Sequence, residues 1–136
     1  MILLDTVVLS ELRKSRPSSR VIQWVQRHQD NDFFISVVSL GEVERGIEKK
    51  RKSEPEFAQE LTQWLENLQR LYADRILPIT PHIARKWGQL SAQLNHDGAD
   101  LLIAATALVH GLTVATRIVR HFEKTKVVLV NPFSEG

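Results

Sequence analysis

The sequence predicts an α/β fold with a short, mostly parallel central sheet flanked by helices. Short runs rich in apolar and β-branched residues alternate with amphipathic segments, which is the order typical of parallel sheets. These runs are continuously apolar instead of alternating, as expected for strands covered on both faces. The chain has 136 residues, so we expect one domain spanning residues 1–136.

The first half of the chain contains two predicted strands and four predicted helices. Residues 1–4 and 33–36 are short apolar runs, the first ending at Asp5 and the second following an Asp-Asn-Asp turn. Ser18 or Ser19 can cap the second helix. The last two helices exceed a minimal α/β arrangement, so we expect them to protrude as a pair. Helical apolar spacing predicts helices over about 6–14, 19–29, 37–50 and 54–72.

The second half continues the alternation. A brief extended piece at 76–79 precedes a helix that begins at Pro81 and ends near residue 94. The most apolar helix follows and is expected to end at Gly111. We therefore predict a helix over residues 97–110 and strands over 112–116 and 126–130.

Composition excludes several classes of protein. Hydrophobic residues make up 43% of the chain and charged residues 25%, which argues against a disordered chain, a coiled-coil rod and a collagen-like fibre. The absence of cysteine excludes a disulfide scaffold, a Cys-ligated metal and a Cys nucleophile. The sequence shows no signal peptide, and its longest apolar run, 101–109, is too short to span a membrane. We expect a cytoplasmic protein without a membrane partner; its net charge of +2 is compatible with nucleic acid.

Three acids stand out by position. Asp5 directly follows the first strand, where open α/β sheets place their ligands. Glu42 lies beside the apolar stripe of its helix, and Asp100 lies in the first turn of the apolar helix. If these positions converge, three carboxylates repel one another unless a cation intervenes. All-oxygen ligands favour Mg²⁺ or Mn²⁺, which can activate a water against a phosphodiester.

Each acid also has a structural interpretation. Asp5 can cap the first helix through the amides of Val7 and Val8. Glu42 can be a solvated residue on the face of its helix. Asp100, with Asp97, can complement the dipole of its helix.

Four stretches of the chain, in order, carry a resemblance to a known family. The start, Leu3-Leu4-Asp5-Thr6-Val7-Val8-Leu9-Ser10-Glu11, and the segments at 36–47, 100–107 and 112–117 resemble the motifs of PIN-domain ribonucleases. The likeness is greatest to the VapC toxins of bacterial toxin–antitoxin pairs, in the FitB-like branch. This resemblance spans nearly the whole chain and implies a PIN-like fold.

The resemblance also implies a function and a site. Asp5, Glu42 and Asp100 would hold Mg²⁺ or Mn²⁺, directly or through water, for RNA cleavage. Thr116 would lie beside the metal, where its hydroxyl can bond a carboxylate, although it can also be a strand-end Thr without a partner. The implied partners are an RNA substrate, a cognate antitoxin and a second copy of the chain.

Three positions depart from the family pattern. Val7 and Ile118 stand where the family often has Asn, and neither side chain can form a hydrogen bond. His121 stands where a fourth acid is frequent, and it can meet a phosphate or be a surface residue beside Phe122. These changes bear on rate and metal preference more than on fold.

Basic residues near the fourth motif are candidate phosphate contacts. Arg117 and Arg120 are the preferred RNA-binding residues, although an antitoxin's acidic tail can use the same arginines. The basic run 49–52 can contact RNA or complement the end of its helix. The three acids and the family resemblance together give the leading hypothesis, a metal-dependent endoribonuclease toxin. The resemblance suggests transfer RNA as its substrate. The alternative is a PIN-like protein with an impaired site that binds an antitoxin or RNA without cleaving it.

Overall fold

Five parallel strands form the central sheet of the computed structural model, which describes residues 1–134. They are ordered β3-β2-β1-β4-β5, so the first strand of the chain is central. This arrangement confirms the predicted α/β class, while residues 135–136 of the predicted domain lie outside the described residues. The strands are β1 (Ile2–Leu4), β2 (Phe33–Ser36), β3 (Ile76–Leu77), β4 (Thr113–Ala115) and β5 (Leu129–Val130).

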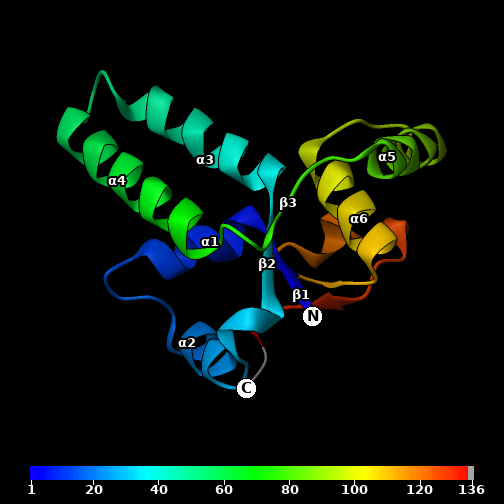
Figure 1. Ribbon diagram of the computed structural model, residues 1–136, viewed down its shortest axis with the longest axis horizontal. Helices are drawn as coiled ribbons and strands as arrows, with labels where there is room; N and C mark the ends of the chain where they lie inside the picture. The colour runs from blue at the N-terminus through cyan, green and yellow to red at the C-terminus, as the bar shows by residue number, and fades with distance from the viewer. Residues whose placement is uncertain (135–136) are drawn as a thin grey trace.

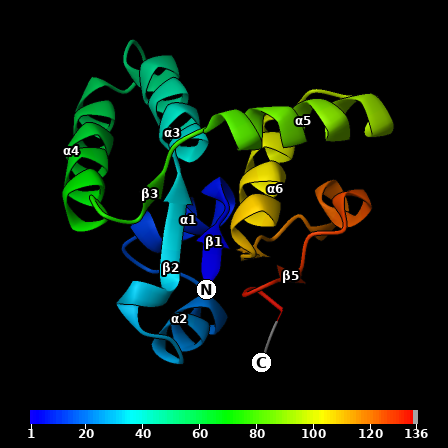
Figure 2. The ribbon, with the colours of Figure 1, turned by 45° about the vertical axis from the view of Figure 1, so that its right-hand side comes forward.

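Six α-helices cover the sheet. Figures 1 and 2 show α3 and α4 side by side, extending together from one side of the molecule, while α5 and α6 lie on the other. The first of these pairs is the protruding pair that the sequence predicts. The helices are α1 (Thr6–Arg13), α2 (Ser19–Gln26), α3 (Val37–Lys50), α4 (Pro55–Leu71), α5 (Pro81–Leu94) and α6 (Ala99–His110).

The central strand β1 is buried on both faces, which explains its continuously apolar sequence. Ile2 and Leu4 belong to a core cluster shared with α1, α2 and α4, whereas Leu3 between them belongs to a second cluster with α5 and α6. Successive strand side chains point to opposite faces, so every residue of β1 reaches a core. The whole strand can therefore be apolar.

The structure corrects several predicted boundaries. The most apolar helix begins at Ala99 and not at residue 97, because Gly98 is its extended N-cap (φ −63°, ψ 162°). The predicted strand at 126–130 is reduced to Leu129–Val130. Lys126, with a φ of 66°, adopts a left-handed conformation that an extended strand excludes.

Two short 3₁₀ helices, absent from the sequence prediction, precede this last strand. They are η2 (Val119–His121) and η3 (Glu123–Thr125). The Phe122 side chain between them is fully buried, and its carbonyl accepts a hydrogen bond from the Thr125 hydroxyl at 2.5 Å. This contact fixes the segment that follows β4 against the core.

Two polar residues follow neighbouring central strands directly. The Asp5 amide after β1 donates to the Ala115 carbonyl at 2.9 Å, and the Thr116 amide after β4 donates to the Val130 carbonyl at 3.0 Å. Because the strands are parallel, both side chains lie at the carboxyl edge of the sheet. The chain turns to opposite sides of β1 at this point, which is where open α/β sheets place ligands. Among residues 1–134, no helix is long and apolar enough to cross a bilayer.

Candidate active site

Asp5 is a buried carboxylate whose two oxygens have different partners. Its side chain is 4% exposed. Oδ1 accepts from the Thr6 amide at 2.8 Å and caps α1, while Oδ2 accepts from the Thr116 hydroxyl at 2.8 Å. The capping interpretation is thus right in kind, although the bonded amide is that of Thr6 and not of Val7 or Val8. Capping uses only one of the two carboxylate oxygens, so Asp5 can cap α1 and still contribute to an active site.

The pKa of Asp5 is raised from 3.8 to about 6, mainly because burial disfavours the charged form. Hydrogen bonds from Thr116 and Thr6 oppose this rise, and the negative charges of Asp100 and Glu42 add to it. The charges of Asp100 and Glu42 therefore each act on the Asp5 carboxylate. A cation beside Asp5 would oppose this repulsion and favour the ionised carboxylate.

Thr116 has a defined structural role at the end of β4. It is fully buried. While its hydroxyl donates to Asp5, its oxygen accepts the Ile118 amide at 3.0 Å. The apolar Ile118 thus contributes to this corner through its main chain. Thr116 has the partner that the sequence analysis expected of it, and it orients the Asp5 carboxylate.

Glu42 reaches the same corner from α3. It is partly buried, so it is not a fully solvated residue on the helix face. The Thr6 hydroxyl donates to Glu42 Oε1 at 2.6 Å and lies 2.8 Å from Ser39 Oγ. Thr6 therefore bonds to both carboxylates: its amide donates to Asp5, and its hydroxyl donates to Glu42.

Asp100 enters from the first turn of α6. Its Oδ2 lies 3.0 Å from His121 Nδ1 in η2, and its side chain is 32% exposed. The ring nitrogen can donate to the carboxylate. His121 therefore does not replace a carboxylate; it pairs with one.

The chemistry of these donors fits a hard divalent ion. Asp5, Glu42 and Asp100 offer carboxylate oxygens, and Thr6 and Thr116 offer hydroxyls. Within residues 1–134, however, no three His, Cys, Asp or Glu side chains lie close enough to hold one ion together. Mg²⁺ is commonly bound through one or two carboxylates while water fills its remaining positions. An ion at Asp5 would be held in this way.

The two arginines proposed to contact RNA line one pocket with Ile118 and Val119, and each also has neighbours of its own. The Arg117 guanidinium lies 4.7 Å from the centre of the Phe133 ring. The pKa of Glu11 is lowered mainly by its hydrogen bond with Lys14, and the charge of Arg117 adds to this effect. Arg120 lines a pocket together with Asp100 and His121. The basic run 49–52 makes local contacts: Arg51 pairs with Glu48 at 2.8 Å, and Lys50 pairs with Glu54 at 3.4 Å.

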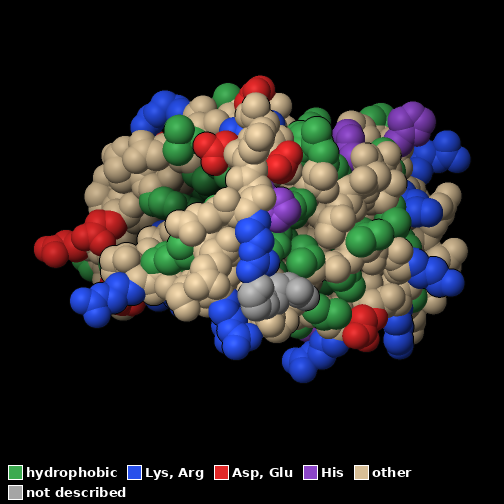
Figure 3. All heavy atoms as spheres, turned by 90° about the horizontal axis from the view of Figure 1, so that it is seen from below, with side chains coloured by type: hydrophobic (Ala, Val, Ile, Leu, Met, Phe, Trp, Pro, Cys, Tyr) green, Lys and Arg blue, Asp and Glu red, His purple; other side chains and the backbone are tan. Residues whose placement is uncertain are grey.

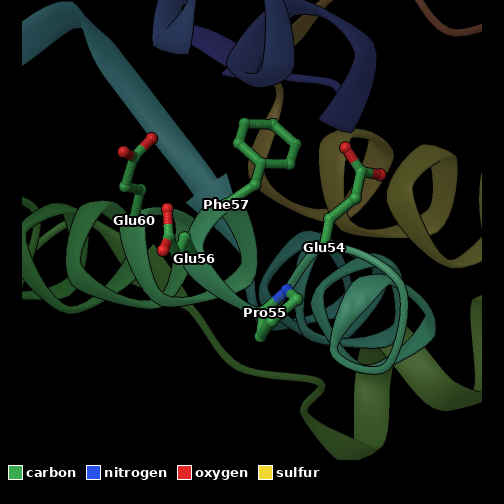
Figure 4. Close-up of a pocket in the computed structure, with 5 residues that line it drawn as sticks. All are labelled: Glu54, Pro55, Glu56, Phe57 and Glu60. Carbon is green, nitrogen blue, oxygen red and sulfur yellow. The ribbon is translucent and has the colours of Figure 1, made fainter.

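A second group of acids lies at the start of α4 and has a different character. Figure 4 shows Glu54, Glu56 and Glu60 around Phe57, with the Glu54 carboxylate standing apart from the other two. All three are exposed, unlike Asp5. Acids at a helix N-terminus complement the helix dipole, which accounts for this group without a ligand.

Sequence reasoning missed two polar residues of the site. Thr6 and Ser39 lie between the Asp5 and Glu42 carboxylates, and Ser39 is fully buried. The sequence could have indicated Ser39, because it is a small polar residue at a buried position of a helix. Thr6 was harder to identify, because a Thr after a capping Asp is common.

Comparison with protein families matches residues 2–125 to the PIN domain. The toxin FitB of Neisseria gonorrhoeae is 33% identical, with 99% of this chain and all of FitB covered. The VapC ribonuclease Y4jK of Sinorhizobium fredii is also 33% identical, with 98% of each chain covered.

Solved structures extend this likeness to the fold. The crystal structure of FitAcB from Neisseria gonorrhoeae has a chain that superposes with a TM-score of 0.82 at 33% identity, covering 99% of this chain and all of that one. A VapBC complex bound to DNA, from Salmonella typhimurium, has a TM-score of 0.77 at 22% identity, covering 96% of this chain and 97% of that one, which shows a shared fold.

Proposed function

The chain belongs to the PIN-domain family, in the branch of the VapC and FitB toxins, and we propose that it is a toxin that cleaves RNA with Mg²⁺ or Mn²⁺. The observation that carries this proposal is Asp5, a buried carboxylate at the carboxyl edge of the central strand. Its pKa is raised in part by Glu42 and Asp100. A buried carboxylate on which two further negative charges act lowers folding stability when it is ionised, so this arrangement favours a cation beside Asp5.

Each site residue has a proposed role. Asp5, Glu42 and Asp100 would hold the metal, with water between the ion and any carboxylate that lies too far away to bind it directly. Thr116 positions Asp5 by donating to Oδ2, and Thr6 positions Glu42 by donating to Oε1. When bound, the divalent ion would lower the pKa of a water molecule and neutralise charge on the phosphodiester.

The proposed reaction is hydrolysis of an internal RNA phosphodiester. The water oxygen bonds to phosphorus, the bond from phosphorus to the 3′ oxygen breaks, and that oxygen takes up a proton. The products are a 3′-hydroxyl end and a 5′-phosphate end. Transfer RNA is the substrate to test first.

The proposed partners follow from the relatives. The solved FitAcB and VapBC structures are of toxin–antitoxin complexes, which supports a cognate antitoxin for this chain. We propose that the single PIN-like domain, residues 1–136, forms a homodimer in the cytoplasm, where the antitoxin and RNA are both present.

The test is cleavage by purified, antitoxin-free protein. It is incubated with total transfer RNA and either Mg²⁺ or Mn²⁺, beside an Asp5→Asn variant of confirmed fold. We expect discrete cuts that require the metal and disappear in the variant. Equal cutting by the variant would contradict the role of Asp5.

The alternative is a protein that binds without cleaving. It is favoured by the pairing of Asp100 with His121 and by the absence, within residues 1–134, of three side chains placed to ligate one ion. On this interpretation, folded protein binds RNA or antitoxin yet leaves RNA intact with either metal. The same cleavage assay separates the two functions.

A further inference from the structure

A pocket of about 380 Å³ opens beside Asp100, between the end of α5, the start of α6 and the two 3₁₀ helices. Asp100, Arg120 and His121 were already considered for the site described above, whereas Leu94, His96 and Lys124 were not. The lining residues are Leu94, His96, Asp100, Arg120, His121 and Lys124.

The lining of this pocket carries an excess of positive charge. Arg120 and Lys124 are cations at neutral pH, against the single carboxylate of Asp100. That carboxylate already has a partner, because His121 Nδ1 lies 3.0 Å from its Oδ2. Glu123, in the same 3₁₀ helix as Lys124, is exposed and is not among the residues that line the pocket.

The segment that carries these cations is held firmly. The Phe122 side chain between Arg120 and Lys124 is fully buried, and the Thr125 side chain is 4% exposed. The amides of His121 and Phe122 are hydrogen bonded to the Ile118 and Val119 carbonyls at 3.0 and 2.9 Å. Two cations on an ordered backbone lose little conformational freedom when they bind an anion. On the face seen from below in Figure 3, Lys, Arg and His side chains also gather at the end of the molecule where Figure 1 places α5.

We infer that this pocket binds a phosphate group of the RNA strand, next to the phosphate that is cut at Asp5. The placement rests on the proposed function, because Asp100 borders the pocket and is also one of the acids proposed to hold the metal. Arg120 and Lys124 supply charge and hydrogen-bond donors, and His96 and His121 supply ring donors. Lys124 and His96 thus become RNA-binding residues that the sequence alone did not indicate.

The experiment measures RNA binding by fluorescence anisotropy in the full chain. All variants carry Asp5→Asn and are kept in chelator, so that no RNA is cut. The probe is a short, fluorescein-labelled single-stranded RNA with hydroxyl ends, titrated at several salt concentrations. We expect Lys124→Gln and Arg120→Gln each to weaken binding about fivefold to tenfold. Each should also lower the slope of log affinity against log salt by about 0.7, the value for one single-strand phosphate contact.

Arg70→Gln is the matched control for Arg120→Gln. This arginine is exposed in the last turn of α4, a helix on the other side of the molecule from α5 and α6 (Figure 1). The change removes the same charge, so it should leave affinity and salt slope unchanged, and Lys124→Arg should retain most of the binding. Wild-type affinity and slope in both pocket variants would overturn the proposal. An equal loss in Arg70→Gln would also overturn it, because binding would then follow overall charge and not the pocket.

A second RNA with a 5′-phosphate distinguishes the source of the phosphate. An equal loss for both RNAs on Lys124→Gln assigns an internal phosphate to the pocket. A loss confined to the 5′-phosphorylated RNA assigns a terminal phosphate and overturns the placement beside the cut. Because these measurements need no cleavage, an inactive enzyme with an intact Lys124 effect would refute the proposed function alone. Cleavage by wild type without any Lys124 effect would refute the pocket alone.

Discussion

Replacing Asp5 by Asn should stabilise the metal-free protein at neutral pH. The pKa of Asp5 is raised from 3.8 to about 6, so the folded state binds this proton more tightly than the unfolded state does. At about 1.36 kcal/mol per pKa unit, ionising Asp5 above pH 6 costs about 3 kcal/mol of folding free energy. Asn resembles the protonated acid in shape and carries no charge, so it escapes this cost.

The direction of this stability difference follows from how protein stability depends on pH. Between pH 3.8 and about 6, the folded wild type binds more protons than the unfolded chain, so the Asp5 contribution makes stability fall as pH rises. The variant lacks this fall. Above pH 6 it should therefore exceed the wild type by up to about 3 kcal/mol, or roughly 10 °C in Tm.

Urea denaturation in chelator, between pH 4 and pH 8, measures this difference directly. Asp97→Asn is the control, because Asp97 is exposed before α6 and its replacement should change stability by less than about 0.5 kcal/mol. Adding Mg²⁺ or Mn²⁺ at pH 8 should raise the Tm of the wild type and leave that of Asp5→Asn unchanged. A variant that is less stable than the wild type at pH 8 in chelator, with the same pH slope, would refute the reasoning.

Three further substitutions test neighbouring contacts. Thr116→Val removes the hydroxyl that lowers the pKa of Asp5, so the acid limb of the pH–rate profile for cleavage should move to higher pH; an unmoved limb would contradict this role. Glu11→Ala leaves the Ser18 amide, now bonded to Glu11 Oε2 at 2.7 Å, without that partner, and should cost about 1–3 kcal/mol in urea denaturation. His121→Asp places a second carboxylate beside Asp100. It should lower the Tm in chelator and enlarge the Tm gain from Mg²⁺, and a smaller gain would count against a metal there.

Much of the fold was predictable because local physics and tertiary structure agree there. The apolar run before Asp5 forms β1, and the helical spacing after Ser36 forms α3 with the predicted bounds. Predictions failed where a single backbone conformation decides the outcome. Gly98 delays the start of α6, and the left-handed Lys126 shortens the last strand. The two 3₁₀ helices had no periodic signal, because each is only three residues long.

The candidate site likewise contains features that the sequence predicts and features that depend on tertiary structure. The sequence alone singles out Asp5 at a strand end, Glu42 beside an apolar stripe and Asp100 at a helix start. The Thr116 bond to Asp5 exists because β1 and β4, far apart in the chain, are neighbours in the sheet. The charges of Glu42 and Asp100 act on Asp5 because α3 and α6 pack near the end of β1. Strand order depends on how both faces of the sheet are covered, which no local pattern encodes.

The sequence by itself determined the elements, the family motifs and the acidic character of the site, because helical period, strand apolarity and side-chain chemistry are local properties. Only the tertiary structure decided which side chains are buried and which lie next to one another. It buried Asp5 and paired His121 with Asp100. It also gave Arg117 and Arg120, which line one pocket together, different further neighbours: Arg117 packs on Phe133, and Arg120 borders the pocket beside Asp100. Burial and distance set the energy of a charge, and both arise only when remote segments pack together.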